Sequence, residues 1–159
     1  MIKRAIYSLL LILITSLKVM GLPYCDVRKF SIIDGLAANR ISGIAQTPDR
    51  LMWFSTWNGI SYYDGNSFHT FRDEADDIDL LSTNRFMDIY ATARNNVWCI
   101  TASRRLYSYE TKLCTFIPVG DNINKLYNID LRVDKIYPIK QGNTWVTTKS
   151  GDYLIRIKG

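Results

Sequence analysis

The sequence contains few of the residues from which catalytic and metal sites are built. Its 159 residues include one histidine, His69, and three cysteines. No serine, threonine or cysteine has a histidine in the pattern that activates a nucleophile, and the sequence has neither a metal-ligand cluster nor a glycine-rich phosphate loop. We therefore expect no enzyme activity, no cofactor and no bound metal. His69 itself is expected on the surface of an outer strand.

The sequence also lacks an excess of positive charge outside its first 20 residues. The formal net charge is +5, from 20 basic and 15 acidic residues, but Lys3, Arg4 and Lys18 belong to a start that contains no acidic residue. The remainder is nearly balanced, which argues against nucleic-acid binding. One acidic segment lacks the glycine and the alternating ligands of a calcium loop, so a solvated loop is favoured there. It contains Asp73, Glu74, Asp76, Asp77 and Asp79.

The only long apolar run is Ala5–Leu17, which is 13 residues long. A membrane-spanning helix needs about 20 residues, whereas a run of this length after Lys3 and Arg4 is typical of a signal peptide. We predict a signal-peptide helix over 1–22, export of the remainder, and membrane contact only through an uncleaved signal segment. Cys25 follows the leucine of a lipoprotein signal by three residues, but Pro23 and Tyr24 are atypical there, so a plain exported start is favoured over lipidation.

Three cysteines cannot all pair with one another. Cys99 and Cys114 are predicted on the second and fourth strands of one small sheet, about 9.5 Å apart. A disulfide tolerates no more than about 7 Å between Cα atoms. Both are therefore predicted to be buried free thiols.

What the sequence does contain is a pattern repeated three times. An arginine is followed after 13 residues by a tryptophan and after three more by a threonine, and successive units start 45 and 47 residues apart. Self-similarity at this period is typical of repeat architectures. The arginines are Arg40, Arg85 and Arg132; the tryptophans are Trp53, Trp98 and Trp145; the threonines are Thr56, Thr101 and Thr148.

Each unit divides into short strands. In the first, strands are predicted over 41–45, 51–56, 60–63 and 68–71, with Asp64-Gly65-Asn66 as a hairpin turn. The second unit repeats this plan with 85–90, 97–101, 106–109 and 113–117. The third has 132–139, 145–148 and 153–157, with no fourth strand.

Four-stranded sheets at this period are propeller blades, and a closed ring takes about four to eight of them. The prediction is an all-β, incomplete β-propeller of about two and three-quarter four-stranded blades after the signal-peptide helix. Blade 1 is placed at 39–72, blade 2 at 84–118 and a partial blade 3 at 131–159. Residues 27–33 resemble a fourth strand and are predicted to be the outer strand of a missing closing blade.

Parts of the first unit closely resemble the two-component regulator propeller repeat. They are Asp34-Gly35-Leu36, Asn39-Arg40-Ile41, Ile44-Ala45-Gln46, Trp53-Phe54, Thr56-Trp57-Asn58-Gly59-Ile60 and Tyr63-Asp64-Gly65-Asn66-Ser67-Phe68. The second unit departs at Arg104, where Gly59 and Gly151 stand in the others. The resemblance implies the periplasmic, glycan-sensing region of a hybrid two-component sensor of Bacteroidetes type, and this chain would be an N-terminal fragment of it. His69 lacks the context of a phosphoacceptor helix, so no kinase part is expected here. The alternative is an exported scaffold or interaction module that assembles through its blades.

The repeated residues give the candidate sites. The tryptophans could stack on sugars, but their fixed place beside a threonine favours a structural repeat core. The arginines begin first strands, which line a propeller channel, so Arg40, Arg85 and Arg132 could bind acidic oligosaccharides in a complete propeller. The competing interpretation is that each arginine ties its blade to the next through backbone carbonyls. Other expected partners are the remaining blades or another copy of the chain.

Overall fold

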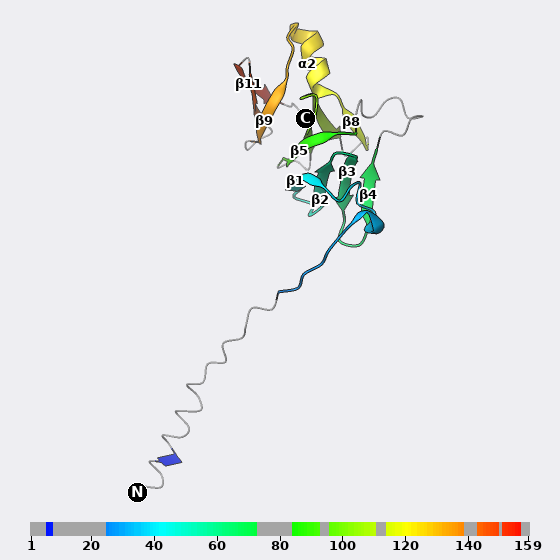
Figure 1. Ribbon diagram of the computed structural model, residues 1–159. Coiled ribbons are helices and arrows are strands. Elements are labelled where there is room, and N and C mark those ends of the chain that lie inside the picture. The colour runs from blue at the N-terminus through cyan, green and yellow to red at the C-terminus, as the bar shows by residue number, and fades with distance from the viewer. Residues whose placement is uncertain are drawn as a thin grey trace.

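A computed structural model of the chain describes residues 6–7, 25–72, 84–92, 96–110, 114–138, 143–149 and 151–156. The predicted signal peptide, apart from residues 6–7, and the acidic loop at 73–79 lie outside these ranges. The described part contains three antiparallel sheets that follow one another along the molecule (Figure 1). No described helix is long and apolar enough to span a membrane.

Blade 1 contains β1 (Ile41–Gln46), β2 (Met52–Thr56), β3 (Gly59–Tyr63) and β4 (Phe68–Phe71), which pair in chain order. The predicted turn between β3 and β4 forms as expected from its sequence. The Asp64 carboxylate accepts hydrogen bonds from the backbone N–H groups of Asn66 and Ser67, both at 2.8 Å. These bonds fix the hairpin in the geometry that an aspartate at the first turn position favours.

Blade 2 has the same order of strands: β5 (Phe86–Ala91), β6 (Val97–Thr101), β7 (Leu106–Glu110) and β8 (Thr115–Ile117). The third sheet contains β9 (Val133–Pro138), β10 (Asn143–Thr148) and β11 (Gly151–Arg156), with β10 in the middle. Each strand lies within two residues of its predicted place. The prediction of an all-β, incomplete propeller is confirmed.

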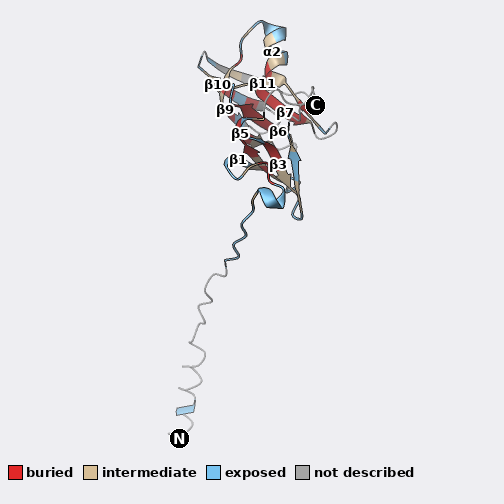
Figure 2. Ribbon diagram, turned by 45° about the vertical axis from the view of Figure 1, so that its right-hand side comes forward, coloured by how far each residue is buried: buried red, intermediate tan, exposed pale blue. Residues whose placement is uncertain are grey.

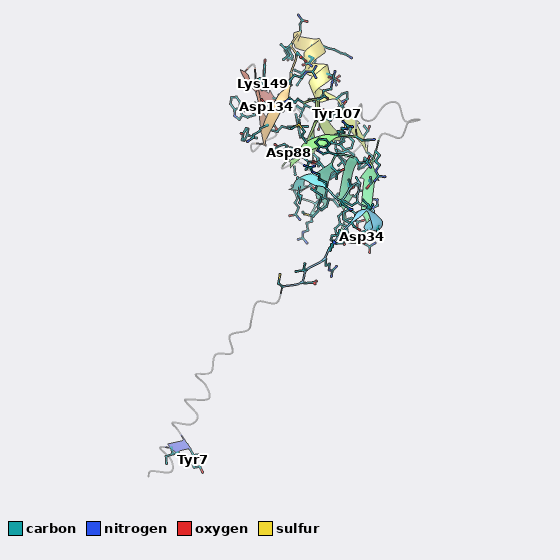
Figure 3. The ribbon with its side chains drawn as sticks, viewed as in Figure 1. Tyr7, Asp34, Asp88, Tyr107, Asp134 and Lys149 are labelled. Carbon is teal, nitrogen blue, oxygen red and sulfur yellow. The ribbon has the colours of Figure 1, made fainter. Side chains whose placement is uncertain are left out.

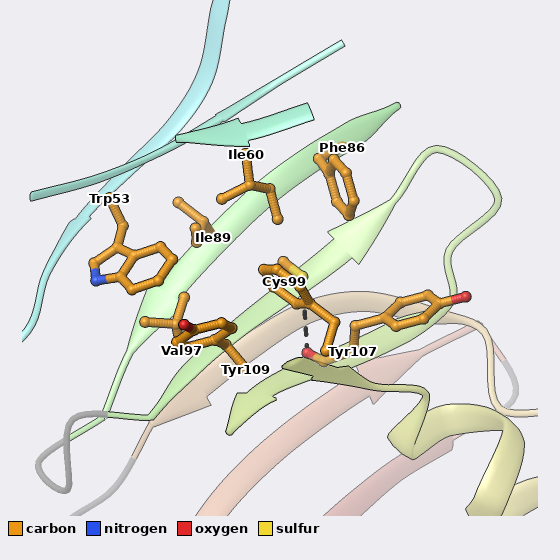
Figure 4. Close-up of a cluster of buried hydrophobic side chains, with 9 residues drawn as sticks. Trp53, Ile60, Phe86, Ile89, Val97, Cys99, Tyr107 and Tyr109 are labelled. Carbon is orange, nitrogen blue, oxygen red and sulfur yellow. Dashed lines mark hydrogen bonds between the residues drawn. The ribbon is translucent and has the colours of Figure 1, made fainter. Parts of the chain in front are cut away.

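The hydrophobic core lies between the blades. In the first cluster, Trp53 and Ile60 of blade 1 pack against a set of blade 2 residues, several of which Figure 4 shows. These are Phe86, Ile89, Val97, Cys99, Tyr107, Tyr109 and Phe116. A second cluster joins Trp98, Ile100 and Leu106 of blade 2 to Val133, Ile136 and Val146 of blade 3. Figure 2 shows the buried residues gathered in the sheets where they face one another.

The first strands of blades 1 and 2 approach each other closely. β1 lies against β5, and the Ser42 hydroxyl donates a hydrogen bond to the Phe86 carbonyl oxygen at 2.8 Å. At Gly43, a Cβ atom would lie 2.5 Å from Asp88 Oδ1 and 3.0 Å from the Ile89 backbone nitrogen. Glycine is therefore required at this position for the two strands to meet.

One helix was not expected from the sequence. α2 (Val119–Tyr127) follows β8 and packs against β7, and it ends at Asn128, whose φ of 53° is left-handed. Its apolar residues recur at helical spacing, and Val119 and Ile123 pack on the second cluster. The segment is short and lies between two units rich in strands. The helical spacing of its few apolar residues was therefore not recognised in the sequence.

The strand predicted over 27–33 does not form in this structure. Ile32–Asp34 is instead a 3-10 turn, because the Ser31 hydroxyl accepts a hydrogen bond from the Ile33 N–H and Asp34 accepts one from the Ser31 N–H at 2.7 Å. Gly35 ends the turn with a φ of 101°. Residues 27–31 are irregular, since a strand needs a neighbouring strand and no described strand lies beside them. Their role as a closing strand stays a prediction.

None of the three cysteines forms a disulfide. Cys99 is buried, as predicted, and burial raises the pKa of its thiol. The prediction was wrong for Cys114, which is exposed and stands just before β8 with a φ of 51°. Its backbone turns there, so the side chain does not join the strand that follows.

Candidate functional site

The three repeated arginines lie at one end of the sheets. Each precedes the first strand of its blade, and the register pairs the start of that strand with the end of the second: Ile41 with Thr56, Phe86 with Thr101, Val133 with Thr148. The turns between second and third strands are therefore at the same end. We call this the arginine end, defined by Arg40, Arg85 and Arg132 together with Trp57, Arg104 and Lys149 of these turns.

The repeated threonines shape the turns. The Thr56 hydroxyl donates to the Gly59 carbonyl oxygen at 2.8 Å, and the Thr148 hydroxyl donates to that of Gly151 at 2.6 Å. In blade 2 the Thr101 hydroxyl accepts a hydrogen bond from the Arg105 N–H at 3.0 Å. The structural role predicted for the threonines is thus to hold the turn in place.

The departure at Arg104 is an inserted turn residue. The register of blade 1 pairs Thr56 with Gly59, whereas Thr101 bonds to Arg105, one residue further along. The left-handed backbone that Gly59 and Gly151 adopt falls on Arg104, with a φ of 64°. Its guanidinium forms an ion pair with Asp134 of β9. The longer turn therefore reaches across from blade 2 to blade 3.

Arg104, Asp130, Arg132 and Lys149 line a cavity of about 540 Å³ at this junction. Arg132 Nε donates to the two carboxylate oxygens of Asp130 at 2.9 and 3.1 Å, and its Nη1 donates to the Ser103 carbonyl oxygen of blade 2 at 3.1 Å. Figure 3 labels Lys149 and Asp134 in blade 3. With Asp134 counted as the partner of Arg104, three cations face two carboxylates, and the remaining positive charge suits an anion such as a carboxylate or a sulfate.

Arg132 therefore fits both sequence interpretations, because it lines a basic cavity and also bonds to a carbonyl of the preceding blade. Arg40 is exposed, and its guanidinium carbon lies 5.8 Å from the centroid of the Trp57 ring, within the range of a cation–π contact. Arg85 is exposed as well. The structure thus places the arginines at one end of the sheets but brings only Arg132 into the cavity.

The sequence reasoning missed three residues of the arginine end. Arg104 was noted only as a departure from the repeat, and Lys149 was not considered, because their turns differ between the units. Trp57 is 52% exposed and follows a repeated threonine directly. Trp57 could have been identified from the sequence, because it is a large aromatic residue in a polar turn.

The repeated tryptophans differ from one another. Trp53 and Trp98 are buried and form the predicted core, and neither indole N–H has a hydrogen-bond partner. Trp145 was predicted to be core but is 44% exposed. The reason is structural: each tryptophan packs against the next blade, and no described residues lie beyond blade 3 to bury Trp145.

His69 and Asp64 form an ion pair on the surface of blade 1. His69 is exposed in β4, as predicted, with Nε2 3.1 Å from Asp64 Oδ2. The pKa of Asp64 is held well below its usual range, mainly by the hydrogen bonds from the Ser67 and Asn66 N–H groups. Within the described ranges, no three His, Cys, Asp or Glu side chains are grouped so as to hold a metal ion.

Comparison with known families gives a match for part of the first unit. Residues 35–58 match the family model described as two component regulator propeller. This segment resembles a two-component regulator propeller repeat. Its match includes Arg40, Trp53, Thr56 and Trp57, so the arginine end of blade 1 belongs to the repeat itself. The search of curated proteins gave no match.

Solved structures with propeller repeats share the fold. The extracellular domain assigned to the hybrid two component system BT3049 of B. thetaiotaomicron is 23% identical, with a TM-score of 0.68 over 82% of this chain. Two structures of the extracellular domain of BT4673 from the same organism are 19% identical over 83% of this chain, with TM-scores of 0.57 and 0.55. The chain covers 19% of the length of each of these structures.

Proposed function

We propose that this chain is a non-catalytic part of the periplasmic, glycan-sensing propeller of a hybrid two-component sensor. The family match and the fold shared with extracellular domains of bacterial regulatory systems support an exported sensor region. The observation that carries the ligand class is the basic cavity between blades 2 and 3. Its guanidinium and ammonium groups suit the carboxylate or sulfate groups of an acidic oligosaccharide.

Trp57, in the turn of blade 1 at the arginine end, supports a carbohydrate over a small inorganic anion. Its exposed ring lies beside the Arg40 guanidinium on blade 1, and an aromatic face packs well on the apolar face of a sugar ring. An oligosaccharide bound along the arginine end would place acidic groups on Arg132 and Lys149 and a sugar ring on Trp57.

Isothermal titration with acidic oligosaccharides and their neutral counterparts tests this proposal. The exported protein should bind the acidic compounds, and Arg132→Ala combined with Lys149→Ala should weaken binding by about tenfold or more, because each charge-assisted hydrogen bond contributes about 1.5–3 kcal/mol. Lys125→Ala is the matched control, since it removes an exposed cation from α2. Equal binding by the control and the double variant would contradict the proposal.

The second candidate is an interaction module that assembles through its blades. The observation that favours it is the exposure of Ile41 and Ile44 on blade 1 and of Trp145 on blade 3.

A further inference from the structure

Blade 1 buries one face against blade 2 and leaves the opposite face open. On the open face, Ile41 and Ile44 are 37% and 57% exposed. The strand registers make them the equivalents of Phe86 and Ile89 in blade 2, which pack in the Trp53 cluster and are 0% and 3% exposed. Blade 1 therefore presents to solvent the positions that blade 2 uses to bury a tryptophan.

Blade 3 leaves open the complementary surface. Trp145 is 44% exposed, whereas Trp53 and Trp98 are 1% and 0% exposed because the next blade buries them. The chain forms the same junction twice, between blades 1 and 2 and between blades 2 and 3. Its two open faces are the two halves of a third junction of this kind.

Phe30 marks where a preceding blade would lie. Its ring centroid is 5.3 Å from that of Phe68 at an interplanar angle of 74°, and 5.2 Å from that of Tyr63 at 46°. At the junction of blades 1 and 2, Phe71 of β4 lies 5.5 Å from Phe116 at 82° and 5.4 Å from Tyr109 at 52°. The registers make Phe68 and Tyr63 the equivalents of Phe116 and Tyr109. Phe30 thus contacts blade 1 as an outer-strand residue contacts the following blade.

The residues before Phe30 have backbone groups free for pairing. Residues 27–30 make no backbone hydrogen bond within the described part of the chain, and Figure 1 shows the segment leading away from the sheets. Blade 3, as far as it is described, has three strands, and β11 pairs only with β10. One chain thus contains residues 27–30, which have no described partner strand, and the sheet of blade 3, which has no described fourth strand.

We propose that two copies of this chain associate head to tail into a closed ring, in which residues 27–30 of each copy supply the fourth strand of blade 3 of the other. Ile41 and Ile44 of one copy then bury Trp145 of its partner. Each copy supplies three blade equivalents, so two copies give six blades, within the range of closed propellers. The proposal rests on the second candidate function, assembly through the blades, and is independent of the ligand proposed above.

The register of the added strand follows from blade 1. Phe71 pairs with Ile60, and the equivalent of Ile60 in β11 is residue 152, since Trp53 pairs with Tyr62 and Trp145 with Leu154. Phe30, as the equivalent of Phe71, comes opposite residue 152. In an antiparallel pair this places Val27 opposite Ile155 of the other copy, which is an apolar pair, and Lys29 opposite Tyr153.

Sedimentation velocity on the exported protein tests the association. The protein should sediment with twice the mass of one chain, and Ile44→Glu or Trp145→Glu should each weaken the association more than about 100-fold, because each buries an unpaired charge in the junction. Trp57→Glu is the control, since Trp57 is equally exposed but lies on a turn of the arginine end. A single-chain mass at all concentrations, or a ladder of ever larger assemblies, would overturn the two-copy ring.

Mixing the two variants tests that the junction joins different faces. The Ile44→Glu chain keeps an intact blade 3 face, and the Trp145→Glu chain keeps an intact blade 1 face. A head-to-tail junction therefore restores one pairing in the mixture, which should contain a species of two chains that neither variant forms alone. Failure to restore it, while both variants keep the circular dichroism of the unchanged protein, would overturn the head-to-tail arrangement.

A cross-link tests the donated strand. Directly opposed residues on antiparallel strands have Cα atoms about 4.5–5.5 Å apart, which a disulfide can bridge. In a background with Cys25→Ser and Cys114→Ser, oxidation of Val27→Cys with Ile155→Cys should give a two-chain band on a denaturing gel. Val27→Cys with Lys125→Cys should give none. Equal cross-linking of both pairs, or none of either, would overturn the strand register.

Discussion

Replacing Gly43 by alanine should loosen the junction between blades 1 and 2. The new Cβ would lie 2.5 Å from Asp88 Oδ1 and 3.0 Å from the Ile89 nitrogen and the Ser55 hydroxyl. The carboxylate cannot move away freely, because it accepts hydrogen bonds from the Ile89 N–H at 2.9 Å and from the Tyr90 hydroxyl at 2.6 Å. The strands must therefore separate or these bonds must break.

The expected cost follows from these contacts. Overpacking a close contact by one methyl group costs about 1–3 kcal/mol, and a weakened hydrogen bond to a charged group costs about 1.5–3 kcal/mol. We expect Gly43→Ala to lower the free energy of unfolding by about 2–4 kcal/mol, measured by urea denaturation at a concentration where the chain is monomeric.

A double-mutant cycle separates the clash from other effects of alanine. In an Asp88→Ala background the nearest blocking atom is gone, so Gly43→Ala should cost at least about 1 kcal/mol less than in the unchanged chain. The tight contacts to Ile89 and Ser55 remain and account for the residual cost. Strictly additive costs in the cycle would refute the assignment of Gly43 to the close approach of β1 and β5.

Three further predictions concern other sites. Trp98→Phe should cost at least about 1 kcal/mol less than Trp98→Ala in urea denaturation, because phenylalanine retains much of the packing and removes an indole N–H that is buried without a partner; equal costs would contradict this. Arg50→Gly should stabilise the chain by up to about 1 kcal/mol, because Arg50 has a φ of 72°, and thermal unfolding should show no such gain for Asp49→Gly in the same turn. The lowered pKa of Asp64 means that its ionised form stabilises the β3–β4 turn above the ordinary value of 3.8, and this contribution is lost as the pH falls below that value; unfolding midpoints between pH 5 and pH 2 should fall less for Asp64→Asn than for the unchanged chain.

Strand positions could be predicted well because the sequence gives two independent signals for them. The alternation of apolar residues and the turn residues such as Asp64-Gly65 agree in every unit, and the pairing observed for β1 to β4 follows directly. The helix α2 could not be predicted in the same way, because its few apolar residues find their partners only once blades 2 and 3 are packed.

The candidate site was predictable only in part. The spacing of the arginines placed them at one end of the blades, which the strand registers support. The cavity itself depends on Arg104 and Lys149, which come from turns of two different blades. Such a grouping depends on the contact between two sheets, and the two residues do not recur at a fixed spacing in the sequence. The exposure of Trp145 was missed for a related reason, since the pattern identifies equivalent positions but not whether a neighbour is present.

Each buried tryptophan packs against the blade that follows it in the sequence, and this has a consequence for how such chains can change in length. Trp53 is buried by the sheet that follows it, and Trp98 is buried by the sheet after that, so the two junctions share no side chains. Their contributions to folding are then nearly separable, as in other arrays where each unit contacts only its neighbours. Duplication or loss of one whole unit would leave every other junction intact, which gives evolution a simple way to vary the number of units.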